Sequence, residues 1–86
     1  RINRLIEVGM LARSKAGHDK DQIFVIIKTE QEYVYLADGK TRTVCRPKKK
    51  KQKHIQIIKE KQDITGVDDA KLRKIIRNYR ETAKTI

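Results

Sequence analysis

The residues best suited to chemistry form a basic run near the middle of the chain, at residues 46–53. Six of these eight residues are lysine or arginine. Closely spaced cations release condensed counterions when they meet a polyanion, and this release is the main source of affinity for phosphates. The alternative is a solvated segment that keeps the protein soluble or acts as a localisation tag. We favour phosphate binding, because predicted strands bracket the run and anchor both of its ends.

A second polar group lies in and beside a predicted turn at residues 14–21. It combines cations with a glycine that would allow close backbone approach. We expect contacts to phosphate from both segments. The candidate residues are Arg13, Lys15, Gly17, His18 and Lys20 in the first segment, and Arg42, Arg46, Lys48, Lys49, Lys50, Lys51, Lys53 and His54 in the second.

Other kinds of chemistry are not indicated. His18, His54 and Cys45 do not have the spacing of a metal-ligand set. The acidic residues show no paired-carboxylate arrangement, and no phosphate-binding glycine loop or nucleophile elbow is present. We therefore predict a protein that is not an enzyme, without metal, cofactor or small-molecule substrate. Cys45 is expected to lie in a strand as a small buried hydrophobe.

Composition limits the choice of partner. The chain has 86 residues, with 22 Lys and Arg against 11 Asp and Glu, and a net charge of +11. A small domain of this charge would bind nucleic acid, an anionic membrane surface or an acidic protein. The predicted helix lacks the Trp and Phe that would anchor it to a membrane, so we rank that partner last. One cysteine and no apolar run of membrane-spanning length favour a cytoplasmic protein.

The apolar spacing predicts strands first and a helix last, in a single domain. A short lead-in over residues 1–7 precedes an all-β region that ends at residue 58, and residues 59–86 form a linker and a helix. Short strands joined by tight turns favour a small barrel. The expected strands, five in all, cover residues 8–13, 22–28, 33–37, 41–46 and 54–58, with residues 48–53 as a basic loop.

The predicted helix is amphipathic. Thr65, followed by Asp68, is typical of a helix N-terminus. One face is apolar and is the natural cover for the strand at residues 22–28, which is apolar on both sides. The residues of this face are Leu72, Ile75, Ile76, Tyr79 and Ala83.

Two tyrosines, Tyr33 and Tyr35, share one side of their predicted strand. They could stack on unpaired bases. We favour the alternative, that they cover the barrel or contact the helix.

The sequence from Val8 to Ile26 resembles a KOW motif, which is a strand, a glycine-containing loop and a second strand. Gly17 matches the motif, whereas Asp21 stands where a second glycine is usual; Asp tolerates a left-handed conformation better than most residues. Residues 8–58 resemble bacterial KOW-domain RNA-binding proteins related to archaeal and eukaryotic-type large-subunit ribosomal proteins. In that group an Ala-Asp-Gly segment and a Lys-His-aliphatic segment recur, here Ala37, Asp38 and Gly39, and Lys53, His54 and Ile55.

This resemblance implies a mainly β fold, an SH3-like barrel with a C-terminal helix, and binding to large-subunit RNA of the 23S type. It also implies a ribosomal or ribosome-associated protein that contacts neighbouring ribosomal proteins. Recognition would rest on shape and backbone contacts, because side chains read A-form grooves poorly. The alternative is an SH3-like interaction module that docks an acidic partner in the transcription or translation machinery.

Overall fold

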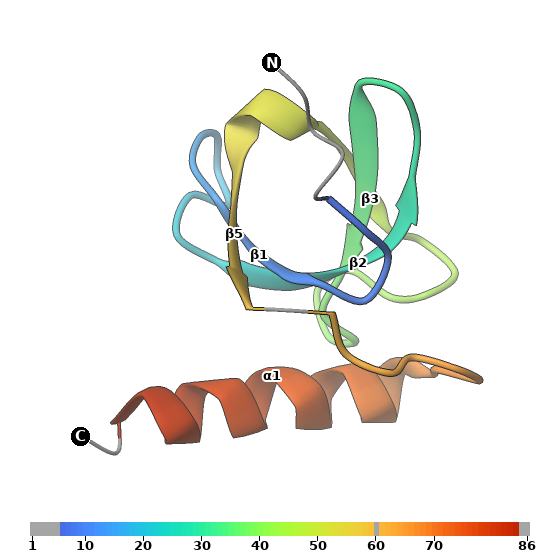
Figure 1. The fold of residues 1–86 in the computed structure, drawn as a ribbon, viewed down its shortest axis with the longest axis vertical. Coiled ribbons are helices and arrows are strands. Elements are labelled where there is room, and N and C mark those ends of the chain that lie inside the picture. Colours follow the sequence, from blue (N-terminus) through green and yellow to red (C-terminus); the bar gives the residue numbers. More distant parts are fainter. Residues whose placement is uncertain (1–5, 60, 85–86) are drawn as a thin grey trace.

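The computed structural model describes residues 6–59 and 61–84 (Figure 1). Five strands and one α-helix form this part of the chain, and they confirm the predicted mainly β fold with a C-terminal helix. Most of the lead-in and Glu60 of the linker lie outside the described residues. The elements are β1 (Leu11–Ser14), β2 (Ile23–Thr29), β3 (Tyr33–Ala37), β4 (Lys48–Lys51), the 3₁₀ helix η1 (Gln52–His54), β5 (Ile55–Lys59) and α1 (Asp69–Lys84).

The strands form one antiparallel sheet in the order β4-β3-β2-β1-β5. Register shifts in the β1–β5 and β2–β3 pairs mark the irregularities at which such a sheet bends. Helix η1 then carries the chain from β4 at one edge to β5 at the other. The carbonyl of His54, the last residue of η1, accepts a hydrogen bond of 2.8 Å from the Lys15 amide. The sheet therefore curls into the small barrel seen in Figure 1.

Strand β2 is buried on both faces, as its sequence predicts. Phe24 and Ile26 face the interior of the barrel, whereas Val25 lies in a second cluster between the barrel and α1. Leu72 and Ile76 of the helix are buried in that second cluster, and Ile75 and Tyr79 pack against it. The predicted apolar face is thus confirmed for these residues; the side chain of Ala83 lies outside the described part. The helix is a structural cover for the barrel, running below it in Figure 1.

The predicted start of the helix at Thr65 is wrong by about one turn. Thr65 lies in a turn, where its amide donates to Asp63 Oδ1 at 3.0 Å. Asp68 is the residue that caps the helix, because its Oδ1 accepts the Lys71 amide at 2.9 Å.

Two predicted segments differ more strongly. Residues 41–46 form bends and not a strand, because Asp38 Oδ1 accepts the amides of both Lys40 (2.9 Å) and Arg42 (2.8 Å) and curls the chain. Cys45 is consequently exposed and is not the buried hydrophobe expected. The fourth strand forms instead at Lys48–Lys51, which was predicted to be a loop. The first strand begins only at Leu11, after a turn at residues 8–9.

Candidate nucleic-acid interface

The four lysines of β4 fall into two pairs with different surroundings. Each lies opposite a residue of β3: Lys48 opposite Leu36, Lys49 opposite Tyr35, Lys50 opposite Val34 and Lys51 opposite Tyr33. Successive residues of a strand point to opposite faces. Lys48 and Lys50 therefore share a face with core residues of β3, and Lys49 and Lys51 share a face with its tyrosines.

Lys50 is buried, with 8% of its side chain exposed. Its ammonium group donates to Asp19 Oδ1 at 2.7 Å, to Ser14 Oγ at 2.8 Å and to the Ala16 carbonyl at 2.8 Å. These three bonds use every donor of the ammonium group. We therefore remove Lys50 from the predicted phosphate-binding residues, because its charge is fully engaged inside the protein.

Asp19 is the acid that neutralises this lysine. Its Oδ1 also accepts the Ser14 hydroxyl at 2.7 Å, and its Oδ2 faces Lys48 Nζ at 3.8 Å. Burial raises the pKa of the Asp19 carboxyl, but hydrogen bonds from Lys50 and Ser14 and the charges of Lys50 and Lys48 outweigh burial. The pKa therefore lies below its ordinary value of 3.8.

This lowered pKa predicts a specific dependence of stability on acid. A carboxyl with a lower pKa in the folded state stabilises the fold above its unfolded pKa, and the contribution is lost as pH falls through the folded pKa. The free energy of unfolding, measured from pH 6 to pH 2, should therefore fall more steeply for the wild type than for Asp19→Asn. Parallel curves, or a ¹³C NMR titration that places the Asp19 carboxyl at or above its ordinary pKa, would contradict this.

The turn between β1 and β2, residues 15–22, is held in shape by its backbone. Gly17 has φ +88° and Asp21 has φ 74°, so Asp21 does adopt the left-handed conformation expected of it. The Asp21 amide donates to the Ser14 carbonyl at 2.8 Å, which closes the turn. The predicted phosphate-binding side chains in and beside it are all exposed: Arg13, Lys15, His18 and Lys20.

The predicted residues of the second segment are placed unevenly. Lys48 reaches the β1–β2 turn, with 31% of its side chain exposed, while Lys49, Lys51 and Lys53 are exposed along β4 and η1. His54 is half-buried and joins the turn through its backbone carbonyl. Arg42 and Arg46 lie in the loop between β3 and β4, the first half-buried and the second exposed.

The two tyrosines of β3 lie under lysines on the outer face of the sheet. Lys49 Nζ is 4.5 Å from the centre of the Tyr33 ring, and Lys28 Nζ is 5.2 Å from that of Tyr35, both within cation–π range. Glu30 accepts a hydrogen bond from the Tyr35 hydroxyl at 3.2 Å. Neither ring belongs to the hydrophobic cluster that contains the helix residues, and both lie half-buried on the outer face of β3, so of the two expected positions they occupy the surface of the barrel.

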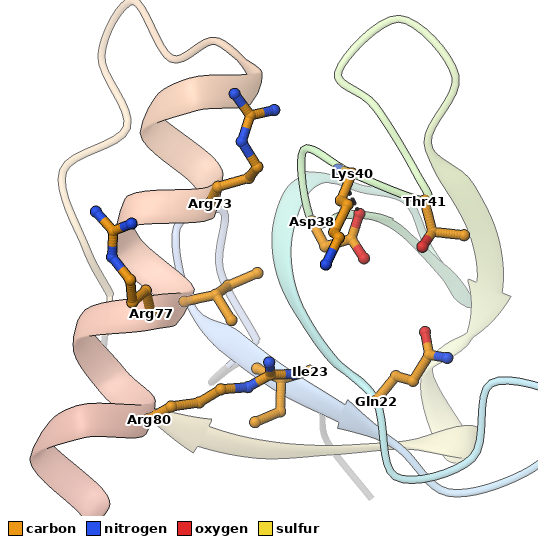
Figure 2. A pocket seen from close by; sticks show the side chains of 9 residues that line it. Gln22, Ile23, Asp38, Lys40, Thr41, Arg73, Arg77 and Arg80 are labelled. Atoms are coloured by element: carbon orange, nitrogen blue, oxygen red, sulfur yellow. Dashed lines mark hydrogen bonds between the residues drawn. The ribbon is translucent and has the colours of Figure 1, made fainter.

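A second basic group lies where the sequence analysis placed no site. A cleft of about 480 Å³ lies between α1 and the barrel at one side of their packed contact, and Lys40, Arg73, Arg77 and Arg80 line it together with Asp38 (Figure 2). The three arginines are four and three residues apart, so they occupy one side of the helix. The spacing of these arginines was the signal available in the sequence.

Other kinds of site are not observed. Among residues 6–59 and 61–84, no group of three or more His, Cys, Asp or Glu residues could hold a metal ion. No helix in this part of the chain is long and apolar enough to cross a membrane. The sequence matches no protein-family model and no curated protein, so the arrangement of these side chains must carry any assignment of function.

Proposed function

We propose that the protein binds structured RNA through one phosphate-binding surface, formed by the β1–β2 turn together with β4 and η1. The RNA that we propose as its ligand is large-subunit ribosomal RNA. The protein would then act in the cytoplasm, as a component of the ribosome or as a factor associated with it. The cations of this surface are Arg13, Lys15, Lys20, Lys48, Lys49, Lys51 and Lys53, and His18 lies among them.

The observation that carries this proposal is the buried contact between Lys50 and Asp19, residues 31 positions apart in the sequence. It fastens the β1–β2 turn to β4, so the two basic segments predicted separately become neighbours. A fixed array of cations loses less conformational freedom on binding than a loose tail would. The pairing of Asp19 with Lys50 and Lys48 also neutralises an acid that would otherwise repel phosphate.

The position of Lys49 supports contact with more than the RNA backbone. Its ammonium group covers the Tyr33 ring in the free protein. If Lys49 moved to a phosphate, the ring would be uncovered for an unpaired base to stack on, as in proteins that bind single strands. Backbone contacts supply most of the affinity in this proposal, and stacking adds to them.

The exposed pair in β4 gives the direct test. Lys49→Gln/Lys51→Gln should weaken binding to a ribosomal-RNA fragment, by up to about tenfold per lysine at 0.1 M salt, because each lost phosphate contact removes released counterions. The slope of log affinity against log salt should decrease in magnitude by about 1–2. Fluorescence anisotropy over a series of salt concentrations measures both quantities.

A matched control has the same change in charge elsewhere. Lys61→Gln/Lys74→Gln removes two exposed lysines outside the proposed surface and should leave the slope unchanged within error. Failure of the wild-type protein to bind ribosomal RNA or large subunits with salt-dependent affinity would overturn the proposal, as would preferential binding to an acidic protein. Sedimentation with large subunits at low and high salt separates a stable component from a transient factor.

A further inference from the structure

The cleft between α1 and the barrel is lined by more positive charge than the fold itself requires. We call it the arginine cleft and define it by Lys40, Arg73, Arg77 and Arg80. Figure 2 shows the arginines extending from the helix on one side and Lys40 on the opposite wall. Of these four side chains, only that of Arg73 makes a hydrogen bond within the described residues, to the Gly39 carbonyl. The side chains of Arg77 and Arg80 make no hydrogen bond or ion pair within the described residues, so both guanidinium groups can bind a ligand.

The charges in the arginine cleft are poorly balanced. Asp38 is the acid that lines it, and its Oδ1 is already used by the amides of Lys40 and Arg42. Like charges three and four residues apart on a helix destabilise it. Arg73, Arg77 and Arg80 therefore repel one another, and an anion in the cleft would reduce that repulsion.

The chemistry of the lining favours phosphate over other anions. Guanidinium groups bind phosphate oxygens with paired, parallel hydrogen bonds. Gln22 and Thr41 add an amide and a hydroxyl at the rim, and Ile23 and Ile76 provide an apolar surface. This combination suits a phosphate that is attached to a sugar.

The walls of the cleft are held in place. The amide of Val44 donates to Asp69 Oδ1 at 2.8 Å, which fixes the loop between β3 and β4 to the first turn of α1. The bond from Arg73 to Gly39 joins the same two elements. A site with fixed walls loses little conformational entropy when it binds a ligand.

We propose that the arginine cleft binds the phosphodiester backbone of the same RNA, as a second contact beyond the proposed surface. This inference rests on the proposed function. Gln22 ends the β1–β2 turn and also lines the cleft, so an RNA strand could pass from Lys20 on the turn to Arg80 on the helix. The RNA would then contact both the barrel and the helix.

The test replaces Arg77 and Arg80, whose side chains have no partner within the described residues. Arg77→Gln/Arg80→Gln should weaken binding to the ribosomal-RNA fragment by about tenfold or more and lower the salt slope by about 1–2. Arg77→Lys/Arg80→Lys keeps the charge but loses the paired hydrogen bonds, so its affinity for the RNA should lie between those of the wild type and Arg77→Gln/Arg80→Gln. The control Lys61→Gln/Lys74→Gln should stay within about twofold of the wild type.

Further measurements separate a binding defect from misfolding. Thermal unfolding of Arg77→Gln/Arg80→Gln should match or exceed that of the wild type, because repulsion is removed. In NMR titrations with the RNA fragment, the amide of Thr41, which lines the cleft and lies outside the β1–β2 turn, should shift in the wild type and not in this variant.

The outcomes distinguish the two proposals. If Lys49→Gln/Lys51→Gln weakens binding but Arg77→Gln/Arg80→Gln does not, the cleft inference is wrong and the proposed function stands. If the wild-type protein does not bind RNA, both are wrong. A shift of the Thr41 amide with an acidic peptide and not with RNA would also overturn the cleft inference.

Discussion

Replacing Lys50 by methionine is expected to lower the free energy of unfolding by about 3–5 kcal/mol, the usual cost of breaking a buried ion pair by removing one partner. Methionine would fill a similar volume but would leave the Asp19 carboxylate, 11% exposed, without its closest cation. Lys48 is too far from that carboxylate, at 3.8 Å, to replace the lost hydrogen bond. Since small domains have total stabilities of about 5–15 kcal/mol, this one change could leave the variant barely folded.

The adjacent residue provides the control. Lys51→Met removes the same charge from the same strand, but Lys51 is exposed on the opposite face and should change stability by no more than about 0.5 kcal/mol. Urea unfolding followed by circular dichroism measures both variants. Equal effects at the two positions would show that the Lys50–Asp19 contact does not stabilise the fold.

Replacing Gly39 by alanine is expected to cost about 2–4 kcal/mol, the sum of a strained backbone and a steric clash. Gly39 has φ +77°, and an added Cβ would clash with the Asp69 carbonyl oxygen in the first turn of α1. Backbone on both sides of this contact leaves no flexible side chain to move away. The helix would have to shift from the barrel, which should lower the melting temperature and expose the apolar cluster around Leu72.

Gly66 separates the two contributions. It also has a left-handed conformation, at φ +65°, but no atom lies within 4 Å of an added Cβ. Gly66→Ala should therefore cost only the backbone contribution, about 1–2 kcal/mol. If Gly39→Ala lowered the melting temperature no more than Gly66→Ala, the close approach of Gly39 to α1 would not contribute to the cost of the substitution.

The sequence predicts the parts of this fold that depend on apolar pattern. Val25 and its neighbours Phe24 and Ile26 are apolar on both faces of one strand, which requires two cores, and the face containing Leu72 and Ile76 fits the second core. Hydrophobic burial is periodic and local, so it can be read from spacing alone.

The site was less predictable, for two physical reasons. Lys48–Lys51 are four identical residues, so nothing in their order shows that Lys50 points inward and Lys49 outward. Lysine is also uncommon in strands, which favours the incorrect prediction of a loop. The partner of Lys50 is far away in the sequence, and the arginine cleft depends on how the helix docks against the loop containing Lys40. Such relationships arise from tertiary packing and leave no local pattern.

The place of β4 in the sheet affects the protein's solubility. It is the last strand in the sheet order, and its outer edge pairs with no other described strand. An open edge can add a strand from a second molecule and start aggregation, and lysines at such an edge discourage this by repulsion. The exposed Lys49 and Lys51 are therefore expected to keep separate copies of the chain apart. Neutralising all four at once would open a path to self-association, and a loss of soluble protein would then be easily mistaken for a loss of affinity.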